Sequence, residues 1–434
     1  MPDSFSSTTT TGYGSRIVNS IKGVVIGLIL FVVSFGLLYW NEGRVDLSNI
    51  AKTATEISSA TVSTDSSLTG KLISTTGVVN SDQIIGDNLF LNPDKFIAAE
   101  REVEMYSWIE KSESHSKTNT GGSETTETTY TYSKGWEENP KSTSNFKHPE
   151  GHENPQKSLD SYTNKVTAAT IGVYNLDPQS VTLPNFSQLP LNSQNITLSD
   201  GATLANDSYL FIKKSEGGTF DSPQVGDLRI NYHVLRPGFD GTIFGKLSGS
   251  KIDPYFDQDG NNLYRVFIGT REQGIATLHT EYTTLLWILR LVGFLLMWFG
   301  LSALFGPISV LMDILPIFGA ISRSLIGVIT FAVAFVLTIV TILVSMIVHS
   351  LIALIIALVI TVGAIIAFFV MLKNKKKASG VMATMTAPVQ TAPPVNQLEN
   401  YVREARVRGM SNDQIRQELL NSGWSNEDVS KILG

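Results

Sequence analysis

Long uncharged apolar runs lie near both ends of this chain, and a polar segment separates them. The first run extends from Gly23 to Trp40. As an α-helix it would be about 27 Å long, close to the thickness of the hydrocarbon core of a bilayer. A cleaved signal peptide is the competing interpretation, because Arg16 and Lys22 precede the run, but signal peptides have shorter apolar cores that end in small residues. Residues 23–40 therefore predict an uncleaved membrane span.

Three further spans are predicted near the C-terminus. From Ser324 to Leu372 the only ionisable residue is His349, and this length suits two helices that turn at His349 and satisfy their own backbone hydrogen bonds. The preceding residues, 308–318, carry Asp313 and are predicted to lie along the membrane interface. The three spans are expected at about 285–305, 324–348 and 351–372.

Basic residues beside the spans predict the orientation, since cytosolic flanks are enriched in Lys and Arg. Arg16 and Lys22 precede the first span, Arg323 precedes the third, and a lysine cluster that begins at Lys373 follows the fourth. With four spans, all of these residues lie on one face. The N-terminal tail (1–22) and the C-terminus are then cytosolic, and residues 41–284 form an extracytoplasmic or lumenal domain.

The polar domain between the spans has the period-two alternation of β-strands, for example from Glu102 to Ile109 and from Asp227 to Val234. Residues 112–129 are nearly all small polar or charged, which predicts a mobile loop or a hairpin tip. The predicted fold class is a multi-span α-helical membrane protein. It has about four transmembrane helices, a large, mainly β (α+β) extracytoplasmic domain and a small C-terminal three-helix module.

Charge and cysteine content exclude several classes of function. The net charge is −6, from 33 basic and 39 acidic residues, and no region interleaves basic runs with aromatic residues. We therefore expect no nucleic-acid partner. The chain has no cysteine, so disulfides, thiolate metal sites and a cysteine nucleophile are excluded.

The sequence predicts no catalytic, cofactor-binding or metal-binding residue. His148 and His152 stand four apart, but Pro149 between them disfavours the helix that would direct both rings to one metal ion. Asp257 and Asp259 suggest a calcium loop, yet the glutamate that completes such a loop is absent. A polar loop and a hairpin turn are the preferred interpretations of these two segments.

Charged and small residues at the membrane edges are candidate functional or packing positions. Arg290 lies about one turn inside the second span, where a charge suggests a functional role, although snorkelling of the long side chain to the interface is the preferred alternative. Glu42 and Arg44 are its candidate partners. Gly23 and Gly27 form a small-xxx-small pair that could bring two helices close together.

The C-terminal region predicts a linker and a small folded module. Residues 373–396 are basic and then rich in Pro, Ala and Thr, as in a flexible linker. Residues 397–434 have apolar positions at helical spacing, with a capping-box pattern that begins at Ser411. We expect three helices that resemble a ubiquitin-associated-like module. Trp424 and Met410 are candidate contacts for an unknown cytosolic partner, and a self-packing cap is the alternative.

Several short motifs resemble the LUMA (transmembrane protein 43) family, as does the layout of one span, a large domain and a C-terminal group of spans. The motifs are Asn41-Glu42-Gly43-Arg44, Lys52-Thr53-Ala54, Tyr130 to Trp136, Ser144-Asn145-Phe146, His152 to Pro155 and Gly226 to Arg229. The resemblance covers roughly residues 20 to 370. It implies a membrane-organising role without an established reaction. In animals this means the endoplasmic reticulum and inner nuclear membrane, with lamina-associated partners. The added C-terminal module suggests a prokaryotic-type homologue in a plasma membrane.

Three functions follow as hypotheses. The first is a non-catalytic integral membrane scaffold that contacts the lipid bilayer and other membrane proteins or further copies of itself. The second is an oligomeric channel or transporter, although the spans offer few polar groups to line a path. The third is an extracytoplasmic hydrolase, which would need acidic groups beside His152 in a pocket.

Overall fold

The computed structural model describes residues 3–199, 201–214, 217–314, 316–350, 355 and 395–434. The chain divides into two compact units, residues 1–354 and 355–434, and each is considered by itself. The predicted fourth span (351–372) lies outside the described residues, apart from Ile355. The predicted linker (373–396) also lies outside them, except for its last two residues.

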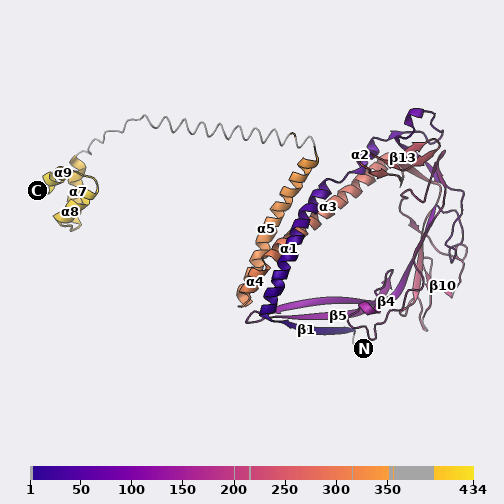
Figure 1. Ribbon diagram of the computed structural model, residues 1–434, viewed down its shortest axis with the longest axis horizontal. Helices are drawn as coiled ribbons and strands as arrows, with labels where there is room; N and C mark the ends of the chain where they lie inside the picture. The colour runs from indigo at the N-terminus through magenta and orange to yellow at the C-terminus, as the bar shows by residue number, and fades with distance from the viewer. Residues whose placement is uncertain (1–2, 200, 215–216, 315, 351–354, 356–394) are drawn as a thin grey trace. The chain divides into compact units, whose positions relative to one another are not determined.

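Long helices and two β-sheets make up the first unit (Figure 1). Within its described residues, three helices are long and apolar enough to cross a membrane, judged by length and composition. The segments predicted at 23–40, 285–305 and 324–348 form the C-terminal parts of these helices, α1, α3 and α5, except that Phe305 lies just beyond the end of α3. The helices of the unit are α1 (Tyr13–Glu42), α2 (Leu47–Lys52), α3 (Arg271–Leu304), α4 (Gly306–Met312) and α5 (Pro316–His349).

Small residues set the contact between α1 and α3. Gly27 is buried, and a methyl group added there would lie 2.7 Å from Cβ of Ala303 and 2.8 Å from the carbonyl oxygen of Gly300. Close backbone approach of this kind is the usual means of helix packing in membranes. Gly23 does not share this role, because a methyl group at Gly23 would have no heavy atom within 4 Å. The expected pair is therefore reduced to Gly27.

The three long helices keep most of their apolar side chains exposed. Trp287 of α3 and Val328 of α5 are each 66% exposed, and α1 exposes large aliphatic residues on several sides. Side chains of this kind in water would be unusual for a soluble protein. Lipid acyl chains are therefore the solvent that suits these surfaces.

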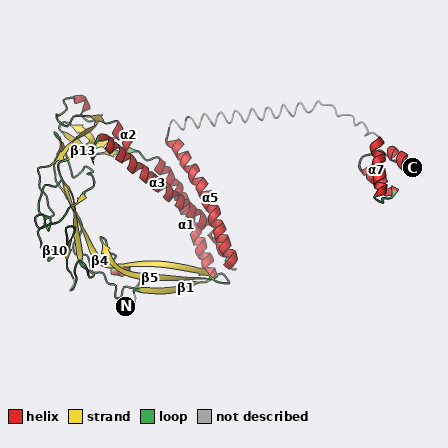
Figure 2. Cartoon of the chain, turned by 180° about the vertical axis from the view of Figure 1, so that it is seen from behind, coloured by secondary structure: helices red, strands yellow, loops and turns green. Residues whose placement is uncertain are grey.

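The first β-sheet contains the long hairpin of the molecule (Figure 2). Among the described residues it has eight strands, all antiparallel, in the order β1-β5-β4-β12-β11-β10, with β6 beside β4 and β9 beside β12. Its strands are β1 (Ser4–Thr11), β4 (Ala98–Thr118), β5 (Glu124–Glu137), β6 (Tyr162–Lys165), β9 (Ser187–Gln188), β10 (Ala202–Leu204), β11 (Leu210–Ile212) and β12 (Leu228–Leu235).

The second sheet closes on itself. Its order in the described part of the chain is β17-β13-β14-β8-β7-β3-β2, and β13 also pairs with β3. Ile73, Ile171, Tyr174, Ile243 and Ile252 fill its core. The strands are β2 (Thr55–Glu56), β3 (Leu72–Asn80), β7 (Ala169–Ile171), β8 (Tyr174–Leu176), β13 (Phe239–Ser248), β14 (Lys251–Asp253) and β17 (Arg265–Ile268). A separate short hairpin joins β15 (Tyr255–Phe256) to β16 (Asn262–Leu263), and single 3-10 turns lie at Ser66–Leu68 and Thr143–Asn145.

The N-terminal tail belongs to the β domain, which corrects the predicted orientation. All eight residues of β1 pair with residues 124–131 of β5. A backbone ladder needs both strands in one aqueous compartment, because a bilayer cannot lie between them. Residues 4–11 and 41–284 therefore do not lie on opposite sides of a membrane in this structure. Residues 112–129, expected as a loop or hairpin tip, are paired hairpin arms around a short turn at residues 119–123.

The helix α3 begins well before its apolar part. Thr270 and Gln273 form a reciprocal capping box, which ends the preceding strand and starts the helix at Arg271. Gly274 then lies against the rings of Phe244 and Phe267. The first turns of α3 thus pack on the β domain and precede the span expected at about 285–305.

A buried ion pair anchors the loop before β4. Asp87 is 6% exposed and accepts hydrogen bonds from the Arg101 guanidinium (2.8 Å) and the Tyr232 hydroxyl. It also accepts bonds from three successive backbone amides, those of residues 89–91. Burial alone would raise the pKa of Asp87, but these hydrogen bonds outweigh burial and lower the pKa below its ordinary value.

The second unit contains the three helices expected at the C-terminus. Ser411 caps the second helix in a capping box with Gln414, and Ser425 caps the third. Ile415 and Val429 are fully buried between the helices, whereas Trp424 and Met410 are partly buried against that core. The helices are α7 (Val395–Val407), α8 (Asn412–Asn421) and α9 (Asn426–Leu433).

The two glycines of α1 allow a matched test of helix packing. We expect Gly27→Leu to separate α1 from α3 and to lower the thermal unfolding temperature of the detergent-purified protein, since overpacking typically costs about 1–3 kcal/mol. Gly23→Leu is the control and should unfold like the wild type. Equal behaviour of the two variants in tryptophan fluorescence melts would contradict the α1–α3 crossing.

The ion pair of Asp87 predicts a dependence of stability on pH. Because the folded-state pKa is lowered, this carboxylate contributes stability that is fully present above its unfolded pKa of about 3.9 and is lost as the pH falls through the folded-state value. Asp87→Asn should cost about 3–5 kcal/mol at pH 7 and flatten the loss of stability that the wild type shows as the pH falls below about 4. The control is Asp94→Asn, which removes an exposed partner of Arg236. Identical pH profiles for wild type and Asp87→Asn would contradict this assignment.

Candidate functional site at the ends of the helices

One charged cluster lies where α1 ends and α3 enters its apolar part. Nε and Nη2 of Arg290 each donate a 2.8 Å hydrogen bond to the two carboxylate oxygens of Glu42. The Glu42 side chain is 4% exposed and that of Arg290 is 16% exposed. Arg290 also stacks over the ring of Trp287, with 4.7 Å to the ring centre. Planar, bidentate geometry of this kind is the strongest form of ion pairing in proteins.

Of the two candidate partners of Arg290, the structure pairs Glu42 with it and not Arg44. Arg44 donates to the side-chain oxygen of Asn41 at 3.3 Å and lies over the rings of Trp40 and Tyr282. It is therefore separate from the Glu42–Arg290 pair. The charge of Arg290 is neutralised by its neighbour, so its chemistry here is that of a cross-link between α1 and α3.

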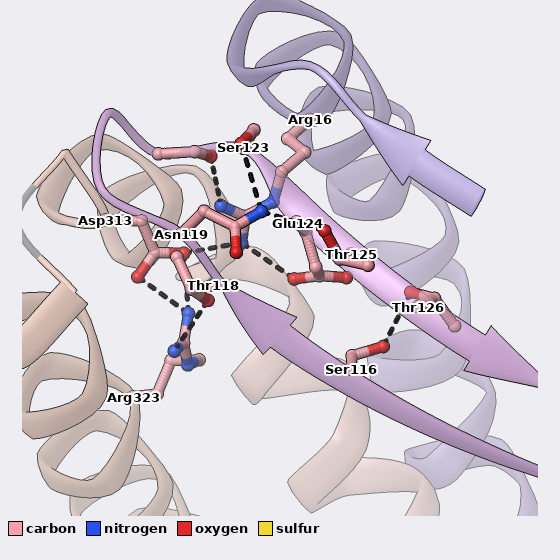
Figure 3. Close-up of polar contacts among 11 residues, drawn as sticks. Arg16, Ser116, Thr118, Asn119, Ser123, Glu124, Thr125, Thr126, Asp313 and Arg323 are labelled. Carbon is pink, nitrogen blue, oxygen red and sulfur yellow. Dashed lines mark hydrogen bonds and ion pairs between the residues drawn. The ribbon is translucent and has the colours of Figure 1, made fainter. Parts of the chain in front are cut away.

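A second charged cluster joins the start of α1 to the residue after α4 and to α5 (Figure 3). Asp313 follows α4, and its carboxylate is completely buried. Arg16 of α1 binds it at 2.5 Å, and Arg323 of α5 binds both of its oxygens at 2.6 and 2.5 Å. Two arginines thus share one buried carboxylate. The segment expected to lie along the membrane interface instead places Asp313 between three helices.

The tip of the β4–β5 hairpin docks on this cluster (Figure 3). Arg16 donates a 2.5 Å hydrogen bond to the carbonyl of Gly122 and forms a 3.0 Å ion pair with Glu124. The amide of Gly121 donates to the carbonyl of Ile314 at 3.0 Å. Gly122 has a φ of +82°, and a side chain there would meet the ring of Tyr13. Glycine is required because both the backbone conformation and the close approach exclude a Cβ atom.

Sequence reasoning used Arg16 and Arg323 only as markers of orientation and did not predict this cluster. Arg16 is in α1, Arg323 is in α5 and Asp313 follows α4. Arg16 and Asp313 are 297 positions apart. The one available signal was an acidic residue, Asp313, in a short link between two apolar segments. An intramembrane or edge charge of that kind needs a partner, but the sequence alone does not say which cations supply it.

The two histidines considered as metal ligands are packed among aromatic rings. His152 is 1% exposed and stacks on Tyr132 with ring centres 3.9 Å apart, while Trp108 meets it edge-on at 4.6 Å. His148 stacks instead on Phe5 of β1. In the described parts of the chain, no group of three or more His, Cys, Asp or Glu residues is arranged to hold a metal ion.

A hollow of about 680 Å³ beside His152 is the place where a hydrolase would need its acid and base. The carboxylate among its lining residues is that of Asp3. Glu110 does not line the hollow, and its carboxylate accepts the Tyr132 hydroxyl at 2.5 Å and the Lys141 ammonium at 3.0 Å. Burial would raise the pKa of Glu110, but these bonds outweigh it and lower the pKa. A carboxylate that stays ionised and fully bonded is a poor general acid.

The aspartates of the suggested calcium loop form a hairpin turn between β15 and β16. Oδ1 of Asp257 accepts the amides of Asp259 at 2.9 Å and Asn261 at 2.8 Å. These bonds, together with one from the Asn261 side chain at 2.8 Å, lower the pKa of Asp257. The carboxylate therefore stabilises the turn itself.

Asp313 offers a direct test of the hairpin contact. Asp313→Asn leaves Arg16 and Arg323 facing a neutral amide, and breaking a buried pair in this way costs about 3–5 kcal/mol. We expect a lower unfolding temperature and faster hydrogen exchange at the Gly121 amide. Asp259→Asn in the exposed turn is the control. Unchanged exchange at residues 119–123 in the Asp313 variant would show that the cluster does not hold the hairpin.

The family model and the curated relatives that match this chain all belong to transmembrane protein 43. The family model of transmembrane protein 43 matches residues 105–351, more than half of the chain. Transmembrane protein 43 of Rattus norvegicus is 27% identical over 348 residues, which cover 74% of this chain and 83% of the relative. The Homo sapiens protein is 26% identical with the same coverage. The Drosophila melanogaster homologue is 28% identical over 302 residues, which cover 64% of this chain and 75% of the relative.

No solved structure matches the chain. The resemblance that the short motifs suggested is confirmed by the family match and by the curated relatives. This chain belongs to the transmembrane protein 43 (LUMA) family.

Proposed function

We propose that this membrane protein is a non-catalytic scaffold that presents a rigid β domain and a separate helical module to partners. The observation that carries the proposal is that charged side chains at both ends of the helices are paired with one another. Glu42 with Arg290, and Asp313 with Arg16 and Arg323, connect helices to one another and to the β hairpin. Charged groups that are fully engaged in fixing structure are not free for proton transfer or substrate binding.

The polar groups between the helices support the same proposal. Thr330 donates to the carbonyl of Ile326 at 2.7 Å and also contacts the Ser302 hydroxyl at 2.8 Å. Ser345 donates to the carbonyl of Tyr39 at 3.0 Å. These hydroxyls join helices to themselves or to neighbours. An ion path would instead require polar groups directed into a water-filled lumen.

The C-terminal module supplies a candidate surface for a partner. The described face of α7 and α9 has a shallow hollow that combines apolar and basic side chains. Val407 at its edge is 84% exposed. A short partner segment with apolar and acidic residues would suit this chemistry. The residues that line the hollow are Glu399, Val402, Arg403, Arg406, Val407, Lys431 and Ile432.

An ion-flux assay with parallel crosslinking separates the scaffold from the channel. Liposomes that contain the purified protein should show no flux above protein-free liposomes, while crosslinking in native membranes should yield discrete complexes with itself or with other proteins. Arg290→Gln should change the amount of complex or the stability and not a conductance. The control is Arg236→Gln, which removes an exposed pair with Asp94. Reproducible currents whose selectivity changes in Arg290→Gln, but not in Arg236→Gln, would overturn the scaffold proposal.

A further inference from the structure

Three successive residues at the end of α1 fix that helix to its neighbours. The side chain of Asn41 is completely buried, and its Nδ2 atom donates to a backbone carbonyl of α3 at 3.0 Å. Glu42 follows and forms the bidentate ion pair with Arg290. Gly43 then lies against α5, because a methyl group added there would be 2.5 Å from Nε2 of His349. Each of the three is therefore committed to contacts between helices.

Arg44, the next residue, is not committed in this way. Its guanidinium lies over the rings of Trp40 and Tyr282, with 5.9 and 5.5 Å to the ring centres. Within the described residues, the guanidinium forms one hydrogen bond, from Nη1 to the Asn41 side-chain oxygen at 3.3 Å. A guanidinium carries five N–H donors. Four donors of this partly exposed side chain therefore have no acceptor among the residues that the structure describes.

The two carboxylates closest to Arg44 in the sequence already have other partners. Both oxygens of Glu42 are bound by Arg290 at 2.8 Å. Asp46 accepts the Ser48 amide at 2.9 Å and pairs with His279 at 2.7 Å. The positive charge of Arg44 is thus not neutralised by either carboxylate, and an anion from outside the chain would complement it.

Aromatic residues place this charge at the edge of the membrane. The uncharged run of α1 ends at Trp40, and Tyr39, Trp40 and Trp287 are all exposed. Trp and Tyr concentrate at the boundary between hydrocarbon and headgroups. Arg44 follows Trp40 by four residues, which is about 6 Å along a helix axis, and the headgroup layer on each side of a bilayer is about 5–8 Å thick. The guanidinium therefore lies at the level of the lipid phosphates.

We propose that Arg44 binds the phosphate of a membrane phospholipid at this end of α1 and α3. The planar guanidinium would bind two phosphate oxygens through parallel N–H groups, a geometry that arginine provides and lysine does not. The acyl chains of the same lipid would cover exposed apolar side chains of α1 and α3, which is why a lipid fits this position better than a soluble anion. The proposal does not rest on the scaffold function. Ion flux and partner capture leave it untouched, so the two proposals can fail separately.

Lipid binding by the full-length protein in nonionic detergent tests the proposal. Native mass spectrometry would measure the affinity of each variant for dioleoylphosphatidylglycerol. We expect Arg44→Gln to bind about tenfold more weakly than the wild type, because a charge-assisted hydrogen-bond pair is lost. Arg44→Lys keeps the charge but not the bidentate geometry and should bind about threefold more weakly. The matched control is Lys52→Gln, which removes an exposed cation of α2 that donates to Asn49, and its affinity should equal that of the wild type.

Two further probes identify the ligand chemistry. Dioleoylglycerol has the same acyl chains without the phosphate, and it should bind equally to the wild type and to Arg44→Gln. Inorganic phosphate should not displace the phospholipid at millimolar concentration. Displacement by phosphate would assign the site to a soluble anion and overturn the proposal.

Thermal melts of each variant keep the result interpretable. Unchanged affinity for phosphatidylglycerol in Arg44→Gln, at the wild-type unfolding temperature, would overturn the proposal. If Arg44→Gln does not fold, Arg44→Lys decides the outcome, and wild-type affinity in that variant would overturn the proposal as well. An equal loss of affinity in Lys52→Gln would show general attraction to cations and not a site at Arg44.

Discussion

The buried carboxylate of Asp313 is the constraint on which the arrangement of the first unit depends. It is completely excluded from solvent and is shared by Arg16 and Arg323. Through Arg16 it also reaches the carbonyl of Gly122 at the hairpin turn. Charges removed from water in this way are tolerated only when they are paired and fully hydrogen-bonded. One carboxylate therefore positions the start of α1, the start of α5 and the tip of the hairpin at the same time.

The helices α1 and α3 are joined by close packing and by an ion pair, which are interactions that stabilise helix contacts in an apolar solvent. Lipid offers no hydrophobic driving force for helix association, so contact depends on close packing at Gly27 and Gly300 and on the Glu42–Arg290 pair. An enzyme would need charged groups that are free for proton transfer, and a channel would need polar groups that face a water-filled lumen. In this member of the transmembrane protein 43 family the glycine contacts and the ion pair hold α1 against α3.

Local properties of the sequence determined much of the fold. The apolar runs that became α1, α3 and α5 are recognisable because lack of charge over about 20 residues is sufficient evidence of a membrane segment. Alternation in β4 and β12 predicted strands because one face of each packs on the core. The caps at Ser411 and Ser425 bond to amides three positions away, so they could be predicted without knowledge of the rest of the chain.

Tertiary structure alone decided how the pieces are joined. Gly23 and Gly27 are equivalent as a sequence pattern, and only the rotation of α1 against α3 selects Gly27. The pairing of β1 with β5 links residues more than 100 positions apart, and a run of threonines carries no signal for its partner strand. The predicted orientation used Arg16 and Arg323 as basic flanks of the spans, and it did not anticipate that both are partners of Asp313. Contacts between distant segments depend on the packing of the whole fold, which no local pattern of residues encodes.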